Sequence, residues 1–247
     1  MKRVTVIYNQ QVQTSRKPRA DAGQKRISQM EVAQLAWIGE QHAVRIDTLR
    51  KLLSRDSGKV EAGQLMTERS VRRRIQRWRT EGLIKYQVLI HRQPGWVWLT
   101  GEGLRRVGLA YRDNQPGYSE LKHVYVCSEV RLRLEAEYGA ILAWTGEREI
   151  RRRVNQLNPS ARRTLHIPDG EARVDEESWA IETELTQKAS QRIRTIVDKL
   201  SKQYDRVLYV THPSAEQAIK REIERRPPQI ANRFQILPLY TVVSDYK

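Results

Sequence analysis

The sequence predicts a mixed α/β protein, α+β overall, that consists of two consecutive parts. In the first part, three helical patterns precede two short apolar runs that are typical of a β-hairpin. In the second part, strand-like apolar runs alternate with amphipathic helical patterns, as in a sheet covered by helices. Charge follows the same division, because the first part is strongly basic and the second is nearly neutral.

The net charge of the 247-residue chain is +16 at pH 7, and most of it lies in the first part. Residues 1–115 contain 23 Lys and Arg against 10 Asp and Glu, whereas residues 116–247 contain 22 against 19. This asymmetry predicts that the first part docks on a polyanion, and double-stranded DNA fits best because the arginines cluster on one helix. The alternative explanation is a merely well-solvated surface.

Composition also indicates where the protein works. No apolar run approaches the roughly 20 residues of a membrane span, and the N-terminal apolar segment is too short for a signal peptide. Cys127 is the only cysteine, which excludes an intramolecular disulfide and a cysteine-rich zinc site. These features predict a cytoplasmic protein that does not enter a membrane.

The chain is expected to begin with a basic flexible arm at residues 1–26, followed by two helices. Ser28 and Glu31 have the spacing of a capping box, so the first helix should begin there. Its apolar positions are Met30, Ala33, Trp37 and Val44. The second helix is expected from Ile46 to about Leu53.

A third helix is expected between its N-cap, Thr67, and about Thr80. Its apolar residues should face the core: Val71, Ile75 and Trp78. Six arginines occupy the other faces, and with no acid among them after Glu68 they would repel one another unless a phosphate chain lay against them. The candidates for DNA contact on this helix are Arg69, Arg72, Arg73 and Arg77.

Two strands are expected after this helix, at residues 86–90 and 96–100, with a turn at residues 92–95. Three helices and a β-hairpin make a winged helix-turn-helix, and Arg92 at the hairpin tip would reach a flanking groove or phosphate. A further helix behind Thr100 would close this domain, which we place at residues 27–115.

A turn-rich stretch at residues 113–117 marks the start of the second domain, residues 116–247. The expected helices cover residues 119–138, 187–204 and 214–225, and residues 147–153 are expected to form a charged short helix or a turn. The expected strands cover residues 141–144, 163–169, 178–185, 206–211 and 234–240, and the later connections should be parallel crossovers.

Acidic residues gather on two of these expected strands. Asp169 would end one strand, while Glu182 and Glu184 lie two apart on the next and so share a face. Two like charges on one face are costly unless a cation or a basic group lies between them, and Lys188 follows at the start of a helix. Carboxylates converging beside a lysine are typical of a site that holds Mg²⁺ against a phosphate.

The pattern Pro168-Asp169 followed by Glu182-x-Glu184 resembles the PD-(D/E)xK nuclease superfamily. From about residue 28 to residue 240, the chain is similar to the replication-relaxation family of plasmid and mobile-element proteins. The matching features are Leu99-Thr100-x-x-Gly103, Leu121-Lys122-His123, Trp144-x-x-Glu147-Arg148 and the Pro168-Asp169 strand. The resemblance implies a winged helix followed by a restriction-endonuclease-like α/β domain.

The same resemblance implies roles for individual residues. Asp169 and Glu182 would hold Mg²⁺ or Mn²⁺, with Glu147 as a further ligand through water, and the metal would activate a water molecule and neutralise charge on the scissile phosphate. The superfamily's lysine normally lies two residues after the second acid, where this chain has Glu184. Lys188 would have to replace it from the following helix.

We therefore expect a DNA-binding protein of a plasmid or mobile element that acts in replication, mobilisation or DNA processing, with a nuclease-like domain. One alternative is a non-catalytic regulator whose degenerate nuclease fold serves homodimerisation or docking of a replication or mobilisation protein. Another is a protein–protein adaptor without a DNA role. The five histidines lack zinc-ligand spacing and are expected to be structural or exposed, except that the resemblance extends to His123.

Overall fold

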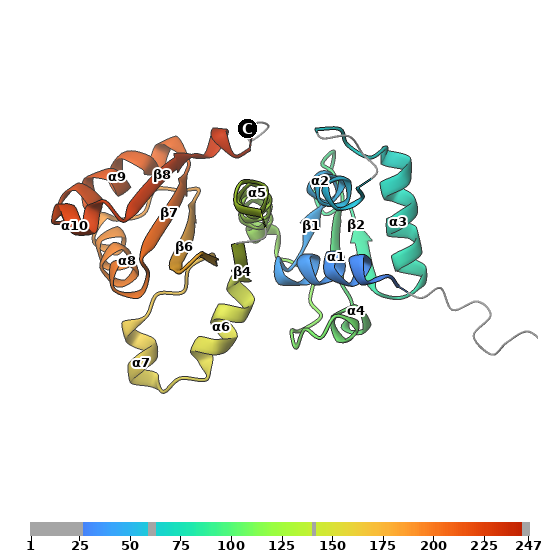
Figure 1. Cartoon of the computed structure of the whole chain (residues 1–247), viewed down its shortest axis with the longest axis horizontal. Coiled ribbons are helices and arrows are strands. Elements are labelled where there is room, and N and C mark those ends of the chain that lie inside the picture. Colours follow the sequence, from blue (N-terminus) through green and yellow to red (C-terminus); the bar gives the residue numbers. More distant parts are fainter. Residues whose placement is uncertain (1–26, 59–62, 140–141, 244–247) are drawn as a thin grey trace, which may run out of the picture.

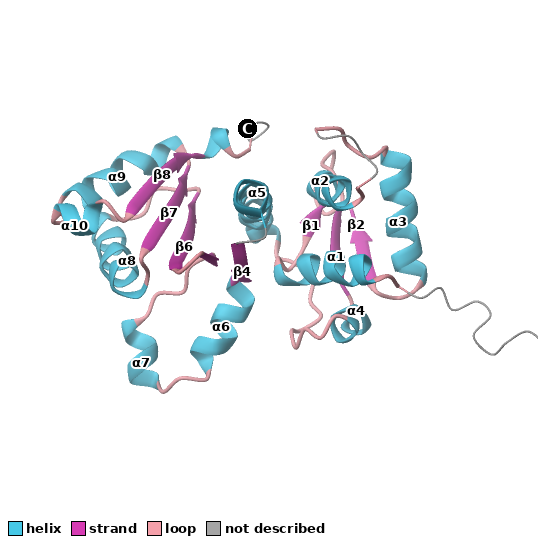
Figure 2. Cartoon of the chain, in the orientation of Figure 1, coloured by secondary structure: helices cyan, strands magenta, loops and turns pink. Residues whose placement is uncertain are grey.

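The computed structural model describes residues 27–58, 63–139 and 142–243, and the expected arm at residues 1–26 lies outside these ranges. The described chain is a mixed α/β structure with one three-stranded and one five-stranded sheet (Figures 1 and 2). None of its described helices is long and apolar enough to cross a membrane.

The first sheet is antiparallel and is surrounded by four helices. Its strands are β1 (Val44–Arg45), β2 (Ile84–Gln87) and β3 (Trp96–Leu99), in the spatial order β1-β3-β2. The helices are α1 (Gln29–Glu40), α2 (Ile46–Asp56), α3 (Glu68–Thr80) and α4 (Gly101–Arg106). Val44 pairs with Val97 and Ile84 with Leu99, so β3 is the central strand.

The predicted helix starts are confirmed by their caps. Ser28 and Glu31 form a complete capping box on α1, and the Thr67 side chain accepts a hydrogen bond from the Ser70 amide of α3. Thr100 caps α4 in the same way by accepting from the Gly103 amide. Only glycine fits at position 103, because a Cβ atom there would overlap the Leu83 carbonyl oxygen.

Two details of the first predicted helix are wrong. Helix α1 ends at Glu40, and His42 then adopts a left-handed φ of 69°, so Val44 belongs to strand β1 and not to the helix. Met30 is 46% exposed and lies outside the core, although Trp37 is buried as expected. The apolar spacing continued past the helix end because β1 enters the same core.

The second sheet combines antiparallel and parallel strands in the order β4-β5-β6-β7-β8. Its strands are β4 (Leu142–Gly146), β5 (Gly170–Val174), β6 (Glu177–Glu184), β7 (Arg206–Thr211) and β8 (Phe234–Pro238). The β4-β5 and β5-β6 pairs are antiparallel, whereas the β6-β7 and β7-β8 pairs are parallel. The expectation of parallel crossovers in the later part is confirmed.

Helices connect and cover this sheet. They are η1 (Tyr118–Glu120), α5 (Leu121–Tyr138), α6 (Glu147–Asn155), α7 (Pro159–Thr164), α8 (Ser190–Gln203), α9 (Pro213–Glu224), α10 (Pro228–Ala231) and η3 (Leu239–Thr241). Helices α8 and α9 cover one face of the sheet, where Val197, Leu200 and Ile219 form a buried cluster with Val207 and Tyr209 of β7.

The strand predicted at residues 163–169 is wrong. Helix α7, with Asn158 as its N-cap and Pro159 in its first turn, continues to Thr164. Residues 165–169 belong to no strand; the Gln203 side chain hydrogen-bonds both the amide and the carbonyl of His166, and the Asp169 amide alone among them donates to β6, at the Ile181 carbonyl. The strand begins at Gly170, so Asp169 precedes a strand instead of ending one.

Helix α5 lies between the two sheets (Figure 1). A single buried cluster joins Trp96 and Trp98 of β3 to Tyr125 and Val126 of α5 and to Ile181 of β6. Trp96 and Trp98 are therefore core residues. The boundary predicted at residues 115 and 116 stays a prediction, but the segments on both sides of it pack against this one helix.

Charged contacts complete the burial of α5. The Arg131 guanidinium forms ion pairs with Glu40 of α1 and Glu135 of α5, both at 2.7 Å. It also lies over the Trp37 ring at 4.7 Å and the Trp144 ring at 5.6 Å. Arg131 is only 8% exposed at its side chain, so this one cation connects α1, α5 and β4.

Replacing Arg131 by Met should lower the free energy of unfolding by about 2 to 3 kcal/mol, because Glu40 and Glu135 lose a buried partner. The cost is below that of a fully buried pair since Glu40 is 28% exposed and Glu135 keeps Arg55. Urea denaturation measures the change. The matched control is Arg105→Met, which removes a surface pair with Glu102 and should cost less than about 1 kcal/mol; equal losses would contradict the central role of Arg131.

Candidate functional site

Asp169 is held against strand β6 by two backbone hydrogen bonds. Its amide donates to the Ile181 carbonyl at 3.1 Å, and its Oδ2 accepts from the Thr183 amide at 2.7 Å. The antiparallel register that pairs Gly170 with Ile181 places Asp169 beside Glu182. The two carboxylates predicted from the sequence therefore meet, although Asp169 arrives from the start of a strand.

Glu182 is a buried carboxylate on strand β6. It is 6% exposed, and its Oε1 lies 3.0 Å from His166 Nε2. Burial and the negative charge of Asp169 raise the pKa of Glu182 to about 7, against the opposing effects of His166 and Lys188. At neutral pH this carboxyl group is therefore close to the midpoint of its titration. Its ionisation is then sensitive to any cation placed beside it.

Glu184 at the end of β6 forms an ion pair with Lys188, and both line the same pocket. We name this hollow the acidic pocket and define it by Asp169, Glu182, Glu184, Lys188 and His166. Its rim also contains His123 and the basic residues Lys122, Arg192 and His212. All four residues predicted to be catalytic line this pocket, and its basic rim suits a phosphate group. The prediction that Lys188 lies in a helix is wrong, because α8 begins at Ser190 and Lys188 belongs to the connection before it.

Glu182 and Glu184 point away from the apolar face of β6, as predicted. Trp179, Ile181 and Leu185 alternate with them and pack into the cluster around α5. Strand β7 pairs with the carboxyl end of β6 as far as Glu184, whereas the β5 ladder stops at Ile181 and the Asp169 side chain takes over by accepting from the Thr183 amide. The acidic pocket is therefore built on a rigid element.

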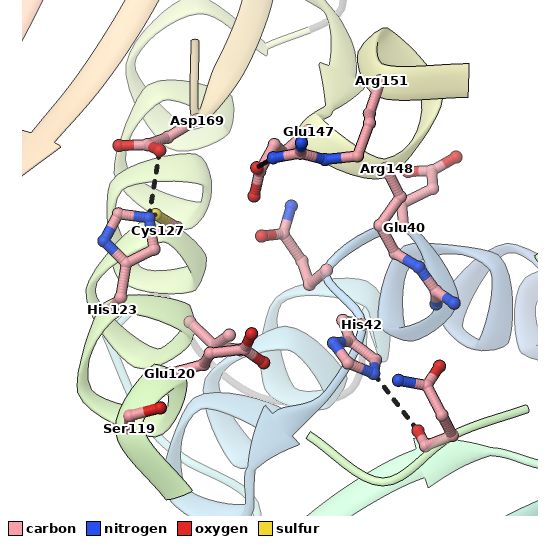
Figure 3. Close-up of a pocket in the computed structure, with 13 residues that line it drawn as sticks. Glu40, His42, Ser119, Glu120, His123, Cys127, Glu147, Arg148, Arg151 and Asp169 are labelled. Atoms are coloured by element: carbon pink, nitrogen blue, oxygen red, sulfur yellow. Dashed lines mark hydrogen bonds and ion pairs between the residues drawn. The ribbon is translucent and has the colours of Figure 1, made fainter. Parts of the chain in front are cut away.

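Glu147, the predicted further metal ligand, lines a second pocket instead of the acidic pocket. This second pocket lies between the two halves of the chain and is lined by Glu40, His42, Glu120, Glu147, Arg148 and Arg151, among others (Figure 3). Glu147 forms an ion pair there with Arg151. Asp169 and His123 line both pockets, so Asp169 lies in the wall that separates Glu147 from Glu182.

Three side chains meet in this wall, two from α5 and one from the residue before β5. His123 Nε2 lies 3.0 Å from Asp169 Oδ1 and 3.5 Å from Cys127 Sγ. Burial of the His123 ring opposes protonation, but Cys127 and Asp169 outweigh it and raise the pKa of His123. Burial raises the pKa of the Cys127 thiol as well.

Sequence reasoning missed the positions of two histidines. His166 and His123 each contact one of the paired carboxylates, whereas the scattered histidines were expected to be structural or exposed. The available signals were the three-residue distance between His166 and Asp169, and the family resemblance at Leu121-Lys122-His123. Neither signal predicts that the fold brings α5 close to the start of β5.

The arginines of α3 fall into two groups. Arg69, Arg72, Arg73 and Arg79 are exposed. Arg74 and Arg77 are only half exposed and form ion pairs with buried Glu31 of α1, and Arg77 also pairs with Glu81. The expectation that all six arginines lack acidic partners is therefore wrong, because Glu31 and Glu81 come from outside the helix.

Arg77, a predicted DNA contact, is thus engaged within the protein. The other predicted contacts on α3 lie on its exposed surface, although Arg72 is within 3.8 Å of Glu68. Arg92 is exposed at the tip of the β2-β3 connection, where it adopts a left-handed φ of 60°. The side chains available to a partner are therefore Arg69, Arg72, Arg73 and Arg92.

Comparisons of this chain with protein-family models, with curated proteins and with solved structures give no match. The chemistry of the site therefore rests on its own residues. The acidic pocket combines two close carboxylates, a histidine and a lysine within a rim of positive charge. Paired carboxylate oxygens suit a hard divalent cation such as Mg²⁺, and the rim suits an anionic substrate.

Replacing Glu182 by Gln should stabilise the metal-free protein at neutral and alkaline pH. The pKa of about 7 in the folded state exceeds the ordinary 4.5, so stability falls as pH rises from about 4.5 to 7 and stays reduced above that range. The Gln variant should gain roughly 3 kcal/mol at pH 8 and nothing near pH 4.

Urea titrations of both proteins across this pH range measure the difference. Glu176→Gln is the matched control because the Glu176 side chain is 97% exposed, and its stability should follow the wild type at every pH. A constant difference between Glu182→Gln and the wild type from pH 4 to pH 8 would show that Glu182 ionises normally.

Proposed function

We propose that this protein binds double-stranded DNA through its first part and cleaves a phosphodiester bond with Mg²⁺ or Mn²⁺ in its second part. The observation that supports cleavage is the meeting of Asp169 and Glu182 in one pocket that also contains Lys188. Burial raises the pKa of Glu182, and the negative charge of Asp169 raises it further, so the two carboxylates repel each other. A divalent cation between them would remove that repulsion.

Asp169 and Glu182 would hold the metal ion, which supplies an activated water molecule and charge neutralisation at the phosphate. His166 orients the Glu182 carboxylate through the 3.0 Å contact between Nε2 and Oε1. Lys122 and Arg192 on the rim would attract and position the phosphate chain. Glu147 faces the second pocket and is left out of this ligand set.

The arrangement of strands supports a PD-(D/E)xK nuclease-like domain at residues 116–247. Three antiparallel strands, β4, β5 and β6, continue into two parallel crossovers, and the acids lie beside β5 and on β6. The resemblance to the replication-relaxation family implies acids on neighbouring strands, and Glu182 on β6 fits this, while Asp169 lies one residue before β5. With it we propose a role in replication, mobilisation or DNA processing of a plasmid or other mobile element.

One observation favours a second candidate function. Lys188, the substitute for the superfamily's lysine, already forms an ion pair with Glu184, and the two metal-binding acids each contact a histidine. A site neutralised in this way fits a non-catalytic DNA-binding regulator whose second part mediates homodimerisation or docking of a replication or mobilisation protein. The two candidates differ in whether DNA is cut.

The order of elements in the first part supports a winged helix-turn-helix. Strand β1 lies between α1 and α2 in the chain, and the β2-β3 hairpin follows α3. Helix α3 would enter the major groove, and Arg92 at the hairpin tip would contact the flanking backbone. Figure 1 shows α3 at one end of the long axis of the molecule, with its outer side uncovered by any other described helix.

The cleavage proposal predicts that supercoiled and linear DNA are cut in the presence of Mg²⁺ or Mn²⁺. Asp169→Asn and Glu182→Gln should each lower the rate by roughly a hundredfold or more, because each replaces one carboxylate oxygen by an amide nitrogen and removes a negative charge from the metal site. Gel electrophoresis of the products measures the rate. The control Glu176→Gln, far more exposed, should cut like the wild type. Intact DNA with normal binding by all four proteins would establish the regulator instead.

The DNA-binding proposal predicts different behaviour for two arginines on the same helix. Arg73→Ala should raise the Kd for duplex DNA and reduce the slope of log affinity against log salt by about 0.9, since one phosphate contact is lost. Arg77→Ala should lower the melting temperature, because Glu31 loses a buried partner, and should keep the wild-type salt slope.

Fluorescence anisotropy at several salt concentrations measures both variants. Arg105→Ala on α4 is the control, because Arg105 is 78% exposed but lies outside α3. A Kd and a salt slope of Arg73→Ala that equal those of the wild type would exclude α3 from the contact, and a salt-independent wild-type affinity would contradict DNA binding as a whole.

A further inference from the structure

A cluster of soft and borderline metal ligands lies beside the acidic pocket. It consists of His123 and Cys127 on α5 and Asp169 before β5, and one ligand atom from each lies within 4.8 Å of the other two. Figure 3 shows the three side chains on one wall of the second pocket, with the Cys127 sulfur behind the His123 ring nitrogen that the dashed line joins to the Asp169 carboxylate. The acidic-pocket chemistry proposed above uses neither His123 nor Cys127.

The geometry does not suit a nucleophilic thiol activated by a histidine and an acid. In such a relay the nucleophile and the acid contact different ring nitrogens, because one nitrogen accepts a proton while the other donates one. Here Asp169 Oδ1 and Cys127 Sγ both approach His123 Nε2, at 3.0 and 3.5 Å. The three ligand atoms therefore converge on one point in space.

We propose that His123 Nε2, Cys127 Sγ and Asp169 Oδ1 bind a Zn²⁺ ion. Around a tetrahedral zinc ion, nitrogen, sulfur and oxygen ligands lie roughly 3.3 to 3.6 Å apart, given metal–ligand distances of about 2.0 to 2.3 Å. The 3.5 Å between Cys127 Sγ and His123 Nε2 matches this spacing, and the 3.0 Å between His123 Nε2 and Asp169 Oδ1 requires a small opening. A thiolate and an imidazole select zinc over magnesium.

The protein holds these ligands in place before any metal arrives. His123 and Cys127 are four residues apart on α5 and so share a face of a helix that is buried between two sheets. Asp169 is fixed through Oδ2, which accepts the Thr183 amide proton and leaves Oδ1 directed at His123. Thr183 Oγ1 also lies 3.5 Å from Cys127 Sγ, so one residue of β6 supports two of the three ligands.

Three protein ligands leave a fourth position, which faces the second pocket. Arg148 and Arg151 line that pocket together with Glu120 and Glu147 (Figure 3). A water molecule would fill the fourth position. The site thus has the open coordination of a reactive zinc centre instead of the closed four-ligand set of a structural one.

The test uses Co²⁺ as a spectroscopic substitute for Zn²⁺ in the full chain after chelator treatment. We expect one equivalent of Co²⁺ to give a thiolate-to-cobalt charge-transfer band and the intense visible absorption of a four-coordinate ion, both removed by one equivalent of Zn²⁺. Cys127 is the only cysteine of the chain, so a thiolate band in the wild type can arise only from Cys127. Absence of that band in the folded wild type overturns the proposal.

Variants identify the other ligands. Cys127→Ser should abolish the band, and His123→Ala should weaken Co²⁺ binding by more than the roughly 10- to 100-fold that loss of a supporting contact costs. His91→Ala, an exposed histidine at the hairpin tip, is the matched control and should bind like the wild type. Unchanged binding by His123→Ala, with its circular dichroism unchanged, would overturn the assignment.

This inference does not rest on the proposed function, although both use Asp169. His123 and Cys127 lie outside the Mg²⁺ ligand pair, and the cobalt spectrum is recorded without DNA. Co²⁺ binding through Cys127 without DNA cleavage would support the zinc site and contradict the nuclease proposal. DNA cleavage with Mg²⁺ without a thiolate band would support the nuclease proposal and contradict the zinc site.

Discussion

Burial of α5 between two sheets is the constraint on which the rest of this structure depends. A helix that contacts a sheet on each side has no broad face in contact with solvent. The 18 residues of α5 must therefore both pack against apolar neighbours and form hydrogen bonds or ion pairs with polar ones. Tyr125 and Val126 fill the apolar core, while the charged groups find partners on α1 and α2. Lys51 and Thr48 both bind the buried Glu129 carboxylate at 2.6 Å.

The junction of the two halves is close as well as polar. A Cβ atom on Gly146, which precedes α6, would lie 2.7 Å from the Glu40 carbonyl oxygen at the end of α1. Arg148 then donates to the Gly39 carbonyl at 3.1 Å. Because backbone meets backbone here, the second pocket has rigid walls, and the side chains of α5 and of the start of β5 are held at fixed separations.

Asp169 connects the two candidate metal sites. Each of its carboxylate oxygens has a partner, Oδ2 with the Thr183 amide and Oδ1 with His123, while its charge acts on Glu182 through the protein interior. Ionised groups held this close in a poorly solvated wall contribute more to the binding of a cation than to the stability of the fold. The same wall separates a hard set of oxygen ligands from a set that contains sulfur and nitrogen, so the two sites would select different metals.

The sequence by itself determined the elements whose signals are local. Capping residues such as Ser28 and Thr67, the helical periodicity of α3, the β6-β7 strands and the alternation that aims Glu182 and Glu184 to one side depend only on nearby residues, and all are found. The tertiary structure alone decided which distant groups meet. Glu31 pairs with Arg77, Gln203 binds the backbone of His166, and α5 brings His123 and Cys127 to Asp169. These encounters depend on packing between segments far apart in the chain, for which hydrophobic periodicity contains no information.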